Sequence, residues 1–228
     1  MDLLYFLESR LTFIRNLYGS ATSPFEETKR RIEAGEAPYA DTRDPEHVDE
    51  PAFLAEWQEA DDSIAVVGQW CLCMVQACLQ SYLKECISPA GSVWWDPQRL
   101  RSALSQKQAG SWFGRYKLLF SEELGIEFTA APVSLPDLEQ LNLTRNDLIH
   151  NVDLLSETVE RSEEHAQRFP RALFTDDLWA AVGLDRIRIG NDQLGVAIRL
   201  VRDFCTWLDG IRCNYPQWLR DSGACASR

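Results

Sequence analysis

The strongest constraint on the fold is a stretch without any charged side chain, from Ser63 to Leu83. Its length and composition fit either a membrane-spanning helix or the central buried helix of a helical bundle. Two observations favour the buried helix: no basic flank precedes the stretch, and a polar stripe of Gln69, Gln76 and Gln80 runs along it at helical spacing. We therefore expect a long helix from Pro51 to about Ile87, without membrane contact.

The remainder of the chain shows helical patterns separated by loops. Gly125 is placed to end a helix as a C-cap, and Asn191 and Asp192 are placed to begin one. We expect these elements: a helix at 1–19 that restarts or kinks at Ser23-Pro24 and continues to about 34, a loop at 35–50, a short helix at 99–108, a helix at 111–124, an irregular stretch at 128–136, a helix from 136 to about 168, a short helix at 174–184, a small strand or hairpin at 185–190, and a helix at 191–211.

These elements predict an all-α fold, a bundle of about five main helices with one small extended segment. We expect a single domain over residues 1–228. Its expected parts are N-terminal long helices (1–88), a basic and aromatic insertion (89–134), the segment with the motif helix and the C-terminal helix (135–214), and a tail (215–228) that Trp218 anchors.

The seven cysteines are odd in number and cluster within helical patterns. With no signal peptide in view, this usage predicts a reducing, cytoplasmic location. Cys71 and Cys78 share a helix face but stand about two turns, or roughly 10 Å, apart, too far for a disulfide. Because no ligand pair has zinc spacing, we predict buried thiols, no metal site and no cofactor.

Charge is distributed unevenly along the chain. The formal net charge of −12 disfavours indiscriminate nucleic-acid binding. However, Pro97 to Lys117 contains basic residues and no acid, interleaved with aromatic rings. This patch is suited to holding a polyanion and stacking a base, and equally to docking on an acidic partner or on the chain's own acidic stretch at 44–62.

One short motif carries most of the chemical signal: Thr144 to Asn151, reading Thr-Arg-Asn-Asp-Leu-Ile-His-Asn. Thr144 and Asp147 have capping-box spacing, which would place Arg145 in the first turn of a new helix, where an anion is favoured. The alternative is one unbroken helix from Pro136, with proline at its first position.

Arg145 and His150 are separated by four residues and lie roughly 140° apart around a helix. They do not share a face, so joint action requires Arg145 to swing across or a second copy of the motif. Two apolar stripes suggest a helix covered on both sides, by its own core and by another subunit. The first stripe has Leu138, Leu141, Leu148, Val152 and Leu155 with Arg145 in its gap, and the second has Leu143 and Leu154 with Asn146 and His150 in its gap.

The Arg145-to-His150 motif, with a polar residue directly after the arginine, resembles that of the HEPN superfamily of α-helical bundles. The resemblance covers these six residues and an all-helical context of suitable length. It implies a metal-independent endoribonuclease, typical of toxin–antitoxin or antiviral defence systems, that acts as a homodimer on RNA. One departure is Val152, which stands where members silenced by adenylylation carry tyrosine.

By this resemblance, His150 moves the proton of the ribose 2′-OH or of the leaving oxygen, Arg145 stabilises the scissile phosphate, and Asn146 orients either. Products would end in a 2′,3′-cyclic phosphate. We further predict that substrate is contacted by Asp147, Arg115, Lys117 and Trp112.

Two other classes of function fit the same sequence. A non-catalytic helical module would bind a protein partner, such as an antitoxin, through the acidic loop or a tryptophan-rich surface. The eight tryptophans and the net charge of −12 are the observations that suggest such a module. A nucleotide-binding or small-ligand-binding bundle would instead use the start of the motif helix to hold a phosphate.

Overall fold

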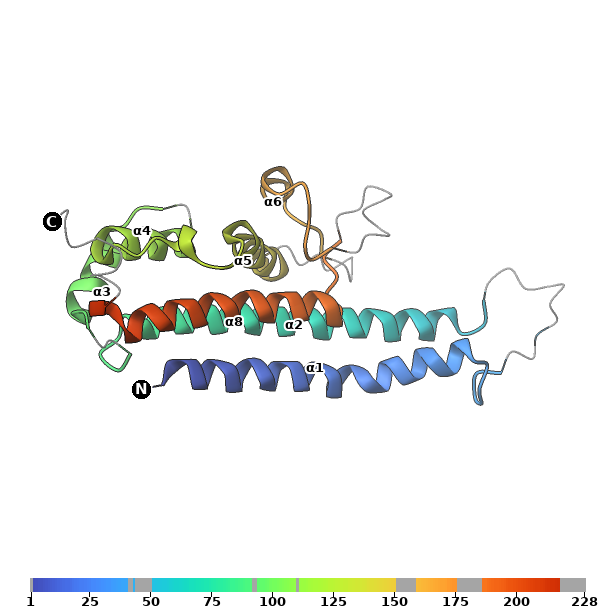
Figure 1. Cartoon of the computed structure of the whole chain (residues 1–228). Coiled ribbons are helices and arrows are strands. Elements are labelled where there is room, and N and C mark those ends of the chain that lie inside the picture. The colour runs from blue at the N-terminus through green and yellow to red at the C-terminus, as the bar shows by residue number, and fades with distance from the viewer. Residues whose placement is uncertain are drawn as a thin grey trace. The chain divides into compact units, whose positions relative to one another are not determined.

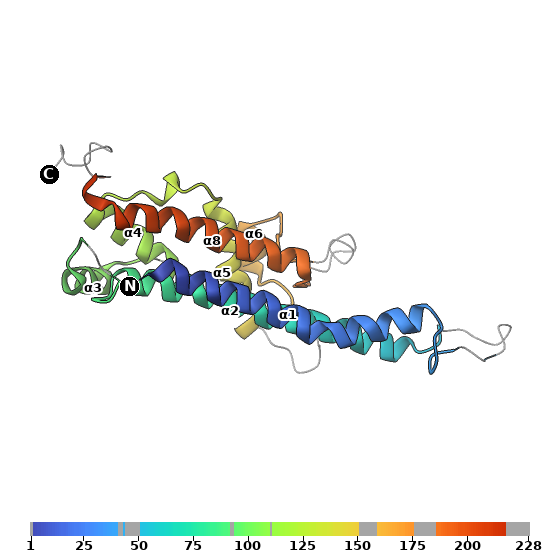
Figure 2. The ribbon, with the colours of Figure 1, turned by 60° about the horizontal axis from the view of Figure 1, so that its bottom comes forward.

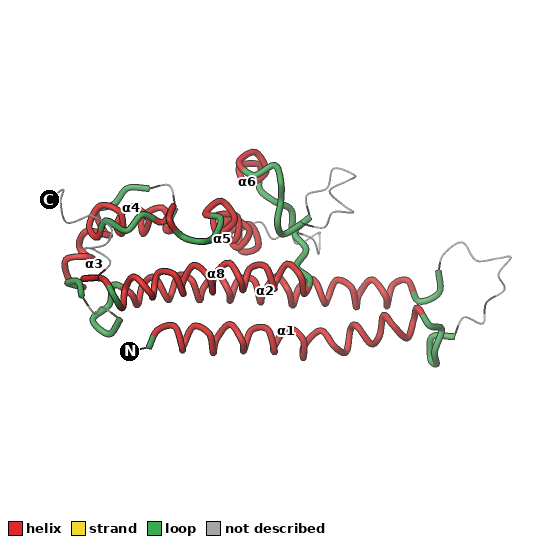
Figure 3. Tube along the Cα trace, in the orientation of Figure 1, coloured by secondary structure: helices red, strands yellow, loops and turns green. Residues whose placement is uncertain are grey.

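Every regular element of the computed structural model is a helix, over the residues that the structure describes: 2–40, 43, 51–91, 94–109, 111–150, 159–175 and 186–217. This confirms the predicted all-α fold class. Figures 1 and 3 show the helices and their connecting loops. The elements are α1 (Leu3–Glu33), α2 (Leu54–Cys86), α3 (Pro97–Gln106), α4 (Trp112–Leu124), η2 (Phe128–Ala130), α5 (Leu135–His150), α6 (Glu163–Arg168) and α8 (Asn191–Cys213).

Several predicted helix ends are confirmed by their caps. The side chain of Ser111 accepts a hydrogen bond from the backbone N–H of Gly114 and begins α4. Gly125 ends the same helix in the left-handed conformation, with a φ of 71°. The cap of α3 was not predicted: Asp96 begins this helix at Pro97, ahead of the predicted start near Arg99, and proline is tolerated at this first position because its missing N–H would have no partner there.

Of the two alternatives for the start of the motif helix, the structure shows the unbroken helix. α5 begins at Leu135, one residue before Pro136, and passes through Thr144 without a break, so Thr144 is a mid-helix residue and not a cap. The predicted end of this helix is wrong. The helix predicted to reach Arg168 does not extend that far, because Val159 to Arg161 are not helical and Ser162 caps α6 anew. Glu160 instead forms an isolated antiparallel bridge with Arg186.

A second bridge joins Thr175 to Ile187. The extended segment predicted near 185–190 is thus present as bridges only, and Phe174 and Thr175 are not helical. The remainder of the helix predicted at 174–184, the apolar positions Val152, Leu154 and Leu155, and the tail beyond residue 217 lie outside the described residues.

The chain divides into two compact units, each assembled from separate segments. Unit 1 comprises 1–12, 74–143 and 196–228, and unit 2 comprises 13–73 and 144–195. The divisions fall within α1, α2, α5 and α8, so these helices contribute to both units. They do not follow the predicted boundaries at 88, 134 and 214, and the single domain stays a prediction.

Aromatic side chains fill the core of unit 1. The ring of Phe128 lies 5.0 Å from that of Phe204 and 5.3 Å from that of Phe120, measured between centroids. All three side chains are fully buried. Beside them, the hydroxyl of Tyr82 donates to a carboxylate oxygen of Asp209, 2.9 Å away.

In unit 2, the second half of α1 and the first half of α2 run side by side (Figures 1 and 2). Lys29 pairs with Asp61, and the indole N–H of Trp57 donates to Glu33 at 2.9 Å, which shows that the two helices are antiparallel. Gly68 of α2 packs directly against the backbone of Ile189.

Among the described helices, α2 alone has the length and apolar composition to cross a membrane, which is weak evidence because core helices of soluble proteins meet the same test. Two glutamines of the polar stripe on α2, Gln69 and Gln76, form hydrogen bonds within the protein. Gln76 is buried and donates to Asn142 at 3.2 Å, and Gln69 donates to the carbonyl of Ile187 at 3.0 Å.

Candidate functional site

The motif helix α5 presents Arg145 and His150 in different settings. Arg145 is half-buried and donates from Nη1 to Oδ1 of Asn146, 3.1 Å away. His150 is exposed at the last residue of α5. Because α5 is one continuous helix here, the two side chains lie on different faces of it. A single copy of α5 therefore does not bring them together.

Arg145 also lies near Cys73 of α2, within unit 2. Burial raises the pKa of the Cys73 thiol, and the positive charge of Arg145 acts in the opposite direction. No carboxylate of the described residues forms an ion pair with Arg145. A half-buried guanidinium without a carboxylate is available to an anion from outside.

Asp147 does not face solvent, although we predicted that it contacts substrate. Its side chain is 6% exposed, and its Oδ2 lies 2.7 Å from Nδ1 of His165, which is 1% exposed. The carboxylate thus has a partner inside unit 2. The neighbouring Thr144 is also buried, and its hydroxyl has no hydrogen-bond partner among the described residues.

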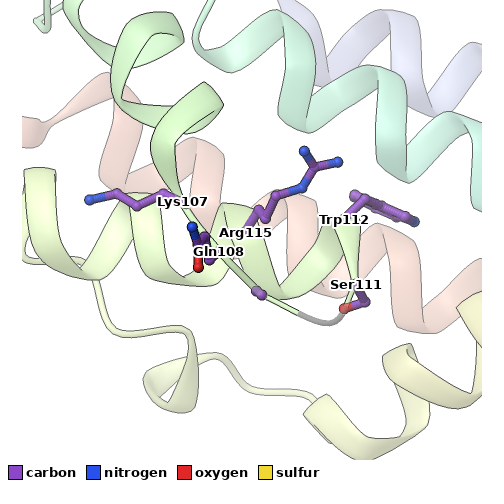
Figure 4. A pocket seen from close by; sticks show the side chains of 6 residues that line it. Lys107, Gln108, Ser111, Trp112 and Arg115 are labelled. Atoms are coloured by element: carbon purple, nitrogen blue, oxygen red, sulfur yellow. The ribbon is translucent and has the colours of Figure 1, made fainter.

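In unit 1, the structure brings Trp112 and Arg115 to the wall of one shallow hollow of about 620 Å³ (Figure 4). Lys107, Gln108, Ala109 and Ser111 complete its lining. Lys117, predicted alongside Trp112 and Arg115, is exposed but does not line the hollow. The predicted site residues therefore fall in two units, with Arg145 to His150 in unit 2 and the hollow in unit 1.

The basic patch is partly neutralised by two acids that follow it on α4. Lys107 pairs with Glu122 and Glu123, and Arg99 pairs with Glu123 at 2.9 Å. Arg115 and Lys117 remain exposed, with no carboxylate partner in the described part of the chain. The positive charge available to a ligand at this hollow is therefore mainly that of Arg115.

Asn142 is a polar residue of α5 that the sequence reasoning missed. It is buried, and its Oδ1 accepts hydrogen bonds from Trp112 and from Gln76. Its position beside Leu138 and Leu141, which are both buried, was the available signal. A polar residue on an apolar face has to find an internal partner.

Comparison with protein-family models, with curated proteins and with solved structures gave no match. The resemblance to the HEPN superfamily therefore stays a prediction that rests on the motif itself. In the described residues, no group of three or more His, Cys, Asp or Glu side chains is gathered in a way that would hold a metal ion.

Proposed function

We propose that the protein is a metal-independent endoribonuclease of HEPN type, with an active site shared between two copies of the chain. The observation that carries this proposal is the setting of Arg145, a half-buried cation held beside Asn146 with no carboxylate among the described residues to neutralise it. Half-burying such a charge without a carboxylate to pair with it is costly, so its presence is better explained by an external anion such as an RNA phosphate.

The surface around Arg145 supports the second copy. Val66, Trp70 and Cys73 follow each other at i, i+4 and i+7 on α2 and so share a face, and Cys73 lies near Arg145. The Trp70 side chain is 67% exposed and Ile149, one turn beyond Arg145 on α5, is 43% exposed. Large exposed apolar side chains next to a charged site are typical of an interface.

In this mechanism, Arg145 of one copy binds the scissile phosphate beside His150 of the other. One imidazole accepts the proton of the 2′-OH while the 2′-oxygen attacks phosphorus. The bond from phosphorus to the 5′-oxygen breaks, and that oxygen takes up the proton from the imidazolium that has formed. The products are a 2′,3′-cyclic phosphate and a 5′-hydroxyl. Histidine suits both proton transfers near neutral pH.

The test is cleavage of single-stranded RNA by the purified chain in EDTA. We expect wild-type activity in the chelator, a loss of about 10²-fold or more for His150→Ala and Arg145→Ala, and unchanged activity for Lys84→Ala, an exposed cation elsewhere on α2. Both motif substitutions alter side chains with solvent access, so thermal unfolding should stay close to wild type. A His150→Ala variant as active as wild type would overturn the proposal.

One observation favours a second candidate, a non-catalytic module that binds another protein. Lys107 and Arg99 form salt bridges with Glu122 and Glu123. These salt bridges make the surface less suited to binding a polyanion than the sequence suggested. Such a module would show no RNA cleavage by either wild type or variants. It would instead bind a protein partner with an affinity that Arg115→Ala reduces and Arg145→Ala leaves unchanged.

A further inference from the structure

Trp112 lines the hollow of unit 1, and the protein holds its ring in place. Its indole N–H donates to Oδ1 of the buried Asn142, which also accepts from Gln76. The ring makes T-shaped contacts with the buried rings of Phe113 and Tyr116, at 5.7 and 5.9 Å between centroids. Trp112 itself is only half-buried, and it contributes to the wall of the hollow. It is therefore a fixed aromatic surface whose one polar atom already has a partner inside the protein.

Arg115 adds one unpaired positive charge to the same hollow. It follows Trp112 by three residues on α4, so the two side chains are neighbours on one face of the helix. Both line the hollow in Figure 4, whereas the side chain of Lys107 extends away from them. Lys107 is also paired with Glu122 and Glu123, while Arg115 is exposed without an ion pair in the described part of the chain. The hollow thus combines one aromatic ring with one available cation.

This combination matches a single nucleotide within a strand. A base stacks on an aromatic ring whatever its sequence, and a guanidinium pairs with a phosphate. A nucleoside triphosphate carries more negative charge than one arginine neutralises, and a duplex keeps its bases stacked on one another. The hollow, of about 620 Å³, is large enough for a base and shallow enough for the neighbouring nucleotides to extend out of it. The exposed amide of Gln108, in the same lining, is available to the edge of the base.

We propose that this hollow binds one nucleotide of a single-stranded nucleic acid, with the base stacked on Trp112 and the phosphate held by Arg115. The proposal goes beyond the ribonuclease function, because the site is built from unit 1 alone and binds without cleaving. Stacking does not depend on charge, so the contact is compatible with a net charge of −12, which disfavours binding by charge alone.

The probe for stacking is a short, fluorescently labelled strand of 2′-O-methyl RNA, whose blocked 2′-oxygens prevent cleavage. Its binding to the full chain is followed by fluorescence anisotropy. Trp112→Leu should weaken binding by about 5-fold or more, and Trp112→Phe, which keeps an aromatic ring, should retain most of the affinity. Trp94→Leu is the matched control and should bind like wild type. Trp94 is a 52% exposed indole of unit 1 outside the hollow, and its N–H likewise has a partner, the carbonyl of Cys213.

The phosphate contact is tested by the dependence of binding on salt. Each phosphate contact of a single strand contributes about −0.7 to the slope of log K against log salt concentration. Arg115→Ala should therefore reduce the slope by about 0.7, whereas Trp112→Leu should leave it unchanged. Arg101→Ala is the matched control, because Arg101 is an exposed arginine of α3 outside the hollow. It should change neither the affinity nor the slope.

Binding that Trp112→Leu leaves unchanged would overturn the proposal. Equal effects of Arg115→Ala and Arg101→Ala would also overturn it, because charge alone would then hold the strand. A wild-type chain that does not bind the probe would overturn it in favour of an acidic protein partner. Adenosine monophosphate that displaces the strand at equal concentration would assign the hollow to a free nucleotide, again against the proposal.

If Trp112→Leu does not fold, photo-crosslinking of the wild-type chain decides. A strand carrying 4-thiouracil bases should, on irradiation, label a peptide that contains Trp112, and labelling only at other peptides would overturn the proposal. Because the probe cannot be cleaved, a failure here is distinct from a failure of the ribonuclease assignment, which is measured on cleavable RNA.

Discussion

Asn142 accepts a hydrogen bond from the indole N–H of Trp112, and this bond ties α5 to α4 within unit 1. The same oxygen also accepts from the buried amide of Gln76 on α2, 3.2 Å away. One side chain therefore accepts hydrogen bonds from donors on two other helices. Its removal should lower the free energy of unfolding by more than the loss of its own packing would.

We expect Asn142→Ala to lower the free energy of unfolding by about 2–3 kcal/mol, because it leaves two donors without an acceptor. Urea unfolding followed by tryptophan fluorescence measures the change. Asn214→Ala is the control: its exposed amide donates to the carbonyl of Gly210 and, among the described residues, to no other side chain or carbonyl, and we expect a change within about 0.5 kcal/mol. Equal effects of the two substitutions would contradict the role given to Asn142.

Gly68 and Gly19 form a second matched pair. A Cβ on Gly68 would lie 1.9 Å from the carbonyl oxygen of Ile189, which is backbone and cannot move aside cheaply. Gly68→Ala should therefore destabilise the protein by about 2–3 kcal/mol or more. Gly19 lies inside α1 with open space where a Cβ would be, so Gly19→Ala should stabilise by about 0.5–1 kcal/mol. Thermal unfolding of both variants should move the midpoint in opposite directions.

Glu123 supplies a prediction about pH. The hydrogen bond from Arg99 holds the pKa of this carboxyl below its ordinary value of 4.5, and Lys107 acts in the same direction. The stabilisation is thus present above the unfolded-state pKa, and it is lost as the pH falls through the lower folded-state pKa. In urea unfolding across the acidic range, Glu123→Gln should flatten this part of the stability profile, by less than about 1 kcal/mol because the pairs are at the surface. Glu164→Gln, on the exposed face of α6, should leave the profile unchanged.

Elements governed by local signals could be read from the sequence. The start of α4 near Ser111, its end at Gly125 and the uncharged centre of α2 each depend on a few neighbouring residues, and each is found where it was expected. The same local reasoning failed at Thr144, because the capping-box pattern occurs inside a helix whose apolar residues Leu141 and Leu148 are buried. Tertiary burial outweighed the local preference there.

Contacts between distant segments could not be predicted. Asp147 and His165 are 18 residues apart along the chain and meet only because Val159 to Arg161 interrupt the expected helix. A continuous helix would have placed them about 27 Å apart along its axis. Likewise, Pro97 to Lys117 contains no acid, yet Glu122 and Glu123 lie close enough in the fold to pair with Lys107.

The interface proposed for the second copy can be tested at Trp70. Replacing this 67% exposed residue by glutamate places a charge on the α2 face that carries Val66, Trp70 and Cys73. Trp70→Glu should convert dimers into monomers in light scattering coupled to size-exclusion chromatography, and cleavage should fall with it. Tyr5, 63% exposed on α1 in unit 1, provides the control, and Tyr5→Glu should leave the dimer intact. A Trp70→Glu variant that remains dimeric would place the interface elsewhere.

The strongest test of a shared active site uses two inactive variants together. Arg145→Ala retains His150, and His150→Ala retains Arg145, so neither homodimer contains a complete site. In a mixed dimer, the arginine of one copy and the histidine of the other restore one site, while the opposite site lacks both groups. Random exchange of subunits makes half of the dimers mixed, each with one of two sites intact, so activity should recover to about a quarter of the wild-type value. The mixture is equilibrated at a concentration low enough for exchange and is then assayed on RNA in EDTA. If both groups act from the same chain, mixing restores nothing, and the shared site is excluded even if each variant alone is inactive.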